Sequence, residues 1–153
     1  MRRPHSVQVF LVRSGKDQIE FLLLQRHARP ELSLPDFWQG ITGALEEKES
    51  HEQAAIREVL EETGIEITQV QYAVFEQRFP VKPEWRALYG PEATEVCERV
   101  FYTRVLPGTV PHLSNEHKAW RWANSSEAHS LLTFGQNSLC LAAVEHHVQS
   151  NGT

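Results

Sequence analysis

Residues 43–65 read GALEEKESHEQAAIREVLEETGI, and the residues of this stretch are enough to predict its local structure. Ser50 is followed three residues later by Gln53, a pairing typical of a capped helix start. Gly64 fits the left-handed position that often follows the last turn of a helix. Apolar residues recur between them at helical spacing, at Ala54, Ala55, Ile56, Val59 and Leu60. The stretch therefore predicts a loop, a helix over residues 51–63, a glycine stop and a following strand.

Three glutamates of this helix, Glu58, Glu61 and Glu62, are expected on one face, because residues three and four apart are helical neighbours. Their charges repel one another, and the last turn of a helix favours cations rather than anions. A divalent cation would account for the arrangement, because Mg²⁺ and Mn²⁺ take oxygen ligands. The alternative is a solvated acidic helix face with ordinary ion pairs.

The spacing resembles the Nudix box, in which Gly, five residues, Glu and seven residues precede Arg-Glu-apolar-x-Glu-Glu-x-Gly-apolar. The matching residues are Gly43, Glu49, Arg57, Glu58, Val59, Glu61, Glu62, Gly64 and Ile65. The resemblance implies a metal-dependent hydrolase that cleaves a diphosphate linkage. It also implies an α/β fold, the Nudix α/β/α sandwich with a mixed β-sheet between helices. The alternative of another class is a Nudix-fold binding domain without turnover, but such domains usually lose glutamates that this chain keeps.

The resemblance implies metal-ligand roles for the acidic residues. Glu58 and Glu62 are the first candidates and Glu61 is the next, and any one of the three could instead be the general base. Glu116 lies outside the box, in a segment from which several Nudix hydrolases direct a glutamate to the metals. The alternative for Glu116 is a surface residue before a strand, and His117 has a weaker claim to the site.

The loop before the helix also carries expected roles. Arg57 is expected to hold Glu49 and to shape the loop rather than to touch the substrate. Thr42 is a candidate to offer its backbone carbonyl to a metal, and Gly43 would let a phosphate approach the backbone closely. Lys48 occupies a position at which many members of the family carry glycine.

The substrate is predicted from weaker similarities. Residues 37–43, 86–91 and 116–122 resemble those of dihydroneopterin triphosphate diphosphatases of bacterial folate synthesis, which release the monophosphate and pyrophosphate. Residues 113–122 equally resemble dinucleoside tetraphosphate hydrolases, the rival prediction. Candidates to stack against a flat ring are Phe37, Trp38, Trp85, Tyr89 and Phe134. Arg78 is a candidate phosphate contact.

Length and composition agree with one globular domain over residues 1–153, with 41% hydrophobic and 23% charged residues. The net charge of −5 argues against binding to a nucleic acid polymer or an anionic membrane. A small phosphorylated substrate and a monomer or homodimer are expected. Cys97 and Cys140 are expected to be buried free thiols of a cytoplasmic protein.

Alternating and periodic apolar residues predict the remaining elements. Strands are expected over residues 7–12, 19–25, 37–42, 65–75, 95–106 and 119–123, and further helices over 125–132 and 134–148. A long connection is expected over residues 80–91. Strands that precede and follow the first helix, with helices at the end of the chain, indicate a mixed sheet between helices.

Overall fold

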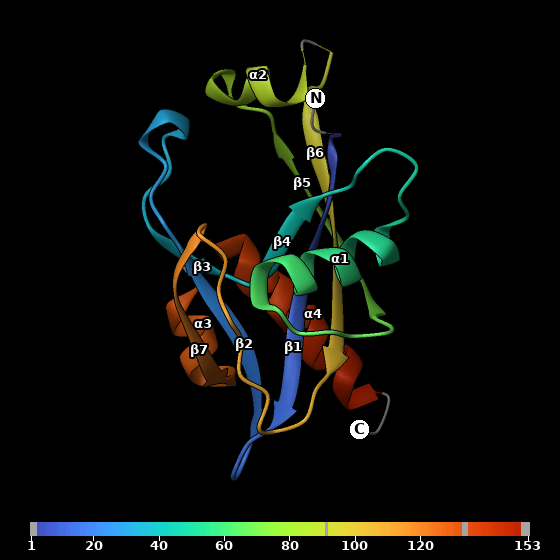
Figure 1. Ribbon diagram of the computed structural model, residues 1–153, viewed down its shortest axis with the longest axis vertical. Helices are drawn as coiled ribbons and strands as arrows, with labels where there is room; N and C mark the ends of the chain where they lie inside the picture. The colour runs from blue at the N-terminus through green and yellow to red at the C-terminus, as the bar shows by residue number, and fades with distance from the viewer. Residues whose placement is uncertain (1–2, 91, 133–134, 151–153) are drawn as a thin grey trace.

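The computed structural model describes residues 3–90, 92–132 and 135–150, and its centre is one mixed sheet of seven strands (Figure 1). The strands are β1 (His5–Ser14), β2 (Ile19–Arg26), β3 (Phe37–Gln39), β4 (Ile41–Ala44), β5 (Gln71–Pro80), β6 (Glu95–Arg104) and β7 (His117–Asn124). The α-helices are α1 (His51–Thr63), α2 (Arg86–Tyr89), α3 (Ser125–Leu131) and α4 (Gly135–Ser150). Two short 3-10 helices are η1 (Pro30–Leu32) and η2 (Pro83–Trp85).

Strand β1 is the centre of the sheet and changes partner along one of its sides. Its other side pairs in parallel with β6, which carries β5 as an antiparallel neighbour. On the changing side, residues Ser6–Val9 pair with β4, and residues Val12–Ser14 pair with β2. β2 in turn pairs with β3 and β7. Because β1 changes partner, β4 lies against the first half of β1. β4 leads into the loop over residues 45–50 that precedes α1, called the box loop below.

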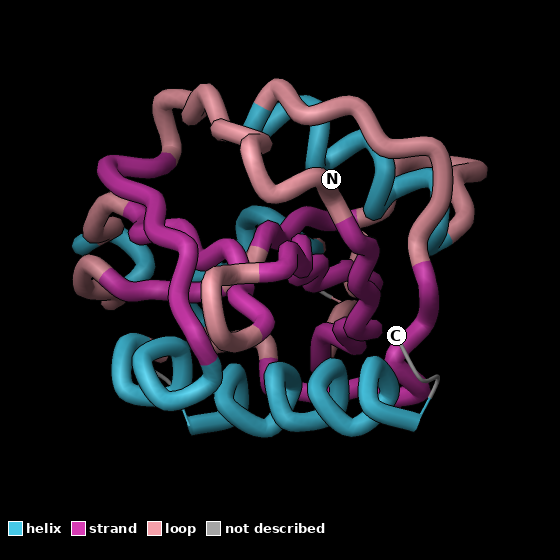
Figure 2. The backbone as a smooth tube through the Cα atoms, turned by 90° about the horizontal axis from the view of Figure 1, so that it is seen from below, coloured by secondary structure: helices cyan, strands magenta, loops and turns pink. Residues whose placement is uncertain are grey.

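Side chains that alternate along β1 build two separate cores. Val7, Val9 and Leu11 pack on the side of α1, whereas Phe10 and Val12 pack on the side of α3 and α4. Successive side chains of a strand point to opposite faces, so one buried strand supplies both cores. Figure 2 shows α4 running along one face of the sheet. The predicted fold class, an α/β/α sandwich around a mixed sheet, is confirmed.

Two predicted strands differ from the observed ones. The strand expected over residues 65–75 is wrong in its position, because β5 spans Gln71–Pro80 and residues 65–70 form no strand. Ile65, Ile67 and Val70 instead pack against the core beside α1, which explains their apolar character. The strand expected over residues 37–42 is divided at Gly40, where a Cβ atom would lie 3.0 Å from the Val9 carbonyl oxygen.

The other differences are small. The connection over residues 80–91 contains η2 and α2, and α4 continues to Ser150. Leu60, expected on the buried face of α1, has 47% of its surface exposed. Cys97 and Cys140 are buried and form no disulfide within the described chain, as predicted. In the same part of the chain, no helix combines the length and the apolar character that a bilayer span requires.

Candidate functional site

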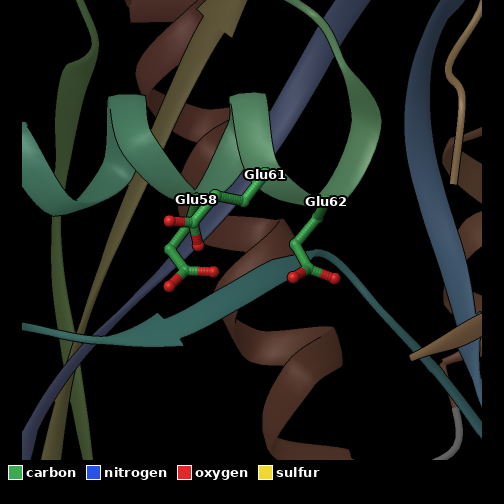
Figure 3. Close-up of side chains that lie close together, drawn as sticks. All are labelled: Glu58, Glu61 and Glu62. Carbon is green, nitrogen blue, oxygen red and sulfur yellow. The ribbon is translucent and has the colours of Figure 1, made fainter. Parts of the chain in front are cut away.

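Helix α1 presents the three predicted glutamates to one cleft. Ser50 caps the helix start together with Gln53, and Gly64 ends the helix in the left-handed conformation, with φ of 70°. Ala54, Ala55 and Val59 pack into the core and fix the rotation of α1, so Glu58 and Glu62 are buried while Glu61 is exposed. One carboxylate oxygen from each glutamate lies within 4.8 Å of the other two. Figure 3 shows the three side chains extending from α1, with β4 passing beside them.

The ionisation of Glu58 is shifted by its surroundings. Burial raises the pKa of this carboxyl to about 7, although the hydrogen bond from Arg57 opposes the shift. The neighbouring charges of Glu61 and Glu62 act in the same direction as burial. A cation held among these groups would favour the ionised form, as it does in other carboxylate sites.

Arg57 holds the loop and the glutamate cluster together. Its Nε and Nη2 atoms donate to the two carboxylate oxygens of Glu49, at 2.7 and 2.8 Å. Nη1 donates to Glu58 at 2.7 Å and to Glu61 at 3.1 Å, and Nη2 also donates to the Ala44 carbonyl at 3.0 Å. The contact expected between Arg57 and Glu49 is therefore present. The same guanidinium also contacts two glutamates of the cluster, which the sequence did not predict.

Glu62 is oriented by the segment that precedes β7. The Ser114 hydroxyl donates to Glu62 Oε2 at 2.7 Å, and His117 Nδ1 lies 2.9 Å from the same oxygen. Burial alone would raise the pKa of Glu62, but the interactions with His117 and Ser114 outweigh it and hold the pKa below its ordinary value. Ser114 had no sequence signal of its own, because 52 residues separate it from Glu62.

The cleft around the cluster has a volume of about 610 Å³. Thr42 and Gly43 of β4 line it, and so does Glu116, the predicted glutamate outside the box. Glu116 Oε2 lies 3.7 Å from Arg26 Nη2, so the carboxylate stands at the cleft beside a cation. Tyr89 also lines this cleft, which places it near the carboxylates rather than among the other ring-stacking candidates.

A second cavity of about 420 Å³ adjoins the carboxylate cleft, and Glu98 lines both. Phe37 and Trp85, two of the predicted ring-stacking residues, lie in its wall. Glu98 was not predicted as a site residue. Its local sequence gave little signal, because the charged Arg99 follows it directly in β6, although only 6% of the surface of Glu98 is exposed.

The structure places two predicted substrate residues elsewhere. Trp38 lines neither cavity and packs against the core on the side of α3 and α4. The Arg78 guanidinium lies in an exposed ion-pair group with Glu76 and Glu95, at 3.2 and 3.0 Å, and also lines neither cavity. Phe134 lies outside the described residues.

Comparison with known proteins agrees with this geometry. The sequence profile of the NUDIX domain matches residues 2–140 of the chain. The chain belongs to the Nudix family. The chain is 33% identical over 132 residues to a dihydroneopterin triphosphate diphosphatase of Haemophilus influenzae, covering 84% of this chain and 80% of the relative. Nudix hydrolysis of a diphosphate linkage is therefore its reaction class.

Two solved structures of Nudix proteins share the fold. The E. coli dihydroneopterin triphosphate pyrophosphohydrolase superposes with a TM-score of 0.76 at 28% identity, covering 97% of each chain. A C. elegans Ap4A hydrolase in a binary complex superposes with a TM-score of 0.73 at 21% identity, covering 95% of this chain and 98% of that one. The second similarity shows the fold alone.

Proposed function

We propose that this Nudix hydrolase cleaves dihydroneopterin triphosphate into dihydroneopterin monophosphate and pyrophosphate, in folate biosynthesis. The observation that carries the proposal is the junction of two cavities at Glu98. One cavity holds a carboxylate cluster suited to phosphates with a metal, and the other has aromatic walls suited to a flat ring. The Haemophilus influenzae and E. coli relatives described above, both named for dihydroneopterin triphosphate, support the same substrate.

The carboxylates fit a divalent cation such as Mg²⁺ or Mn²⁺, because three oxygen donors gather within 4.8 Å on one side of α1. Glu58 and Glu62 would hold the ion, with Glu61 as the third donor. When bound, the ion neutralises phosphate oxygens and makes a neighbouring water more acidic. This chemistry suits water attack on phosphorus, which depends mainly on positioning and charge stabilisation.

The other residues of the site support these groups. Arg57 holds Glu58 and the box loop, while Ser114 and His117 fix the carboxylate of Glu62. In the reaction, the water oxygen bonds to phosphorus and the bridging bond between two phosphates breaks. Pyrophosphate leaves with the electron pair of that bond, and the proton of the water passes to the solvent.

The test compares kcat/KM for dihydroneopterin triphosphate and diadenosine tetraphosphate at equal Mg²⁺ concentration. A higher value for the pterin substrate is expected, and a clear preference for the dinucleotide would assign the protein to the rival activity. Glu58→Gln and Glu62→Gln should each keep the fold and lower kcat by at least ~10². Undiminished turnover after thorough chelation would contradict the metal assignment.

A further inference from the structure

The aromatic cavity has a wall that is fixed before any ligand binds. The Trp85 indole N–H donates to the Leu32 carbonyl at 3.1 Å, which ties η2 to η1. The ring of Phe79 meets the Trp85 ring edge to face, with 6.2 Å between ring centroids. Leu34 and Phe37 complete the apolar lining. A flat ring can therefore enter without the cost of ordering these side chains.

The inner end of the same cavity is polar and buried. Glu98 Oε1 accepts from the Gln8 amide at 2.9 Å and from the Gln77 amide at 2.6 Å. Asn137, at the start of α4, accepts from Gln8 at 3.1 Å through Oδ1, so its own amide N–H groups are not used in this bond. Glu98, Gln77 and Asn137 all line the cavity.

The acceptor sites at this polar end are only partly used by the amide donors, and the Ser6 hydroxyl is a further donor beside Glu98. A carboxylate has about four lone-pair sites, and the two amide bonds to Glu98 both reach Oε1. The Gln77 carbonyl oxygen is buried and has no hydrogen-bond partner among the described residues. Buried polar atoms in folded proteins are nearly always paired. A ligand edge that carries N–H donors would pair with the unused acceptor sites of Glu98 and Gln77.

We infer that this cavity recognises the amino-pyrimidinone edge of a bicyclic heterocycle, with Glu98 as the residue that determines specificity. This inference rests on the proposed function, because it names the group that accompanies the phosphates. The edge carries an amine and a ring N–H beside a carbonyl. Glu98 accepts from the N–H groups, and the Asn137 amide donates to the carbonyl. Guanine and pterin rings share this edge.

The adjoining position of the two cavities supports the assignment. Glu98 lines the carboxylate cleft as well as the aromatic cavity, so a ring held at Glu98 would lie at the boundary between the two cavities. A volume of about 420 Å³ falls within the range of about 300–1,000 Å³ typical of small-molecule sites. Adenine lacks this donor pattern, because its corresponding ring nitrogen is an acceptor.

The first test compares hydrolysis of dGTP and dITP, which differ only by the exocyclic amine, at equal Mg²⁺. The wild-type protein should favour dGTP in kcat/KM by about tenfold or more, within the range for loss of one designed hydrogen-bond partner. Glu98→Gln replaces an acceptor by a donor and should reduce the ratio to below about threefold. Equal rates in the wild type, or an unchanged ratio in a folded Glu98→Gln protein, would overturn the inference. The ratio of kcat/KM for dGTP to kcat/KM for dihydroneopterin triphosphate shows whether a guanine or a pterin ring is preferred.

The second test needs neither turnover nor the Glu98 variant. Pterin and lumazine, which carries a carbonyl in place of the amine, are titrated into the metal-free protein by calorimetry. Pterin should bind at least about tenfold more tightly than lumazine. Trp85→Leu should weaken pterin binding by a similar factor, whereas the matched Trp120→Leu, at an exposed side chain of β7, should leave it unchanged. If pterin binds selectively but no triphosphate is cleaved, only the proposed function fails. If triphosphates are cleaved but pterin and lumazine bind equally, only the inference fails.

Discussion

The carboxylate of Glu58 lies directly against the Cα atom of Gly43, so closely that a Cβ atom at position 43 would overlap Glu58 Cδ. The φ angle of Gly43 is not positive, so the glycine is needed for space rather than for a left-handed turn. The expectation that it opens the backbone to a phosphate stays a prediction. The observed reason is that it makes room for a metal-ligand candidate.

Gly43→Ala should therefore displace Glu58. We expect a loss of about 1–3 kcal/mol in the free energy of unfolding, typical of overpacking, and a fall of at least tenfold in kcat. Denaturant titration and steady-state kinetics measure the two effects. Gly108→Ala is the matched control, because nothing lies within 4 Å of the added Cβ atom there. Full activity in Gly43→Ala would show that the Glu58 position is not required.

Arg57→Lys should impair the site although it conserves the charge. A lysine cannot reproduce the two-point contact with Glu49 while also reaching Glu58 and Glu61. We expect kcat to fall roughly ten- to a hundredfold and proteolysis of the loop at residues 45–49 to quicken. Arg13→Lys, which alters a remote pair with Glu20, should change neither. Wild-type kinetics in Arg57→Lys would contradict the bidentate role.

Ser114→Ala should weaken metal binding without touching a ligand. It removes the hydroxyl that donates to Glu62 Oε2. Loss of such an outer hydrogen bond typically costs about 10–100-fold in metal affinity or activity. Calorimetric titration with Mn²⁺ measures the change. The control is Ser125→Ala, which removes a similar hydrogen bond of 2.6 Å from the Ser125 hydroxyl to Glu145. Neither residue lines the cleft, so the affinity for Mn²⁺ should not change.

The stability of the metal-free protein should fall as the pH rises through about 7. The pKa of Glu58 is raised in the folded state, from near 4.5 to about 7, so its ionisation opposes folding. The contribution of Glu58 to the free energy of unfolding is fully present below pH 4.5. It is lost progressively up to about pH 7 and amounts to roughly 3 kcal/mol. Thermal unfolding in EDTA at several pH values measures it.

The control for this pH dependence is Glu58→Gln, which cannot ionise and should lack this part of the decline. Mg²⁺ should restore stability above pH 7, because the cation favours the ionised carboxylate. Identical pH profiles of the wild type and the variant in EDTA would contradict the raised pKa.

Lys48→Gly should stabilise the box loop. Lys48 has φ of 65°, the left-handed region in which a side chain costs roughly 1–2 kcal/mol. Glycine removes that cost but loses about 0.5–1 kcal/mol through the entropy of the unfolded chain. Urea titration should show a net increase of about 0.5–1 kcal/mol in the free energy of unfolding. Lys48→Ala keeps a Cβ atom and should show no gain.

Local signals made part of this molecule predictable. The α1 helix was predicted over residues 51–63 and observed over His51–Thr63, because its caps, Ser50 with Gln53 and Gly64, lie within the same short stretch. The spacing of Glu58, Glu61 and Glu62 likewise follows from helical periodicity alone. These features need no information about the rest of the chain.

Contacts between distant segments could not be predicted in the same way. Glu98 meets Gln8 across 90 residues, and nothing in either local sequence indicates the partner. The pattern of Ile65 and Ile67 suggested a strand, but tertiary packing against α1 accounts for it without strand pairing. Trp38 followed the aromatic pattern of a ring site, yet the direction of its side chain from β3 depends on the sheet around it.

The position of Arg57 has a consequence for how the stability and the turnover of the enzyme depend on the magnesium concentration. The permanent guanidinium of Arg57 already offsets part of the negative charge of Glu49, Glu58 and Glu61, so the polypeptide carries some of its own counter-charge before any metal arrives. An incoming Mg²⁺ must compete with that guanidinium for Glu58 and Glu61, and this competition lowers its net affinity. Folding therefore does not depend on the ion for all of this counter-charge, although a bound ion adds to the stability of the folded protein. We expect a protein that persists intact when magnesium is scarce and whose turnover rises and falls with the free magnesium around it.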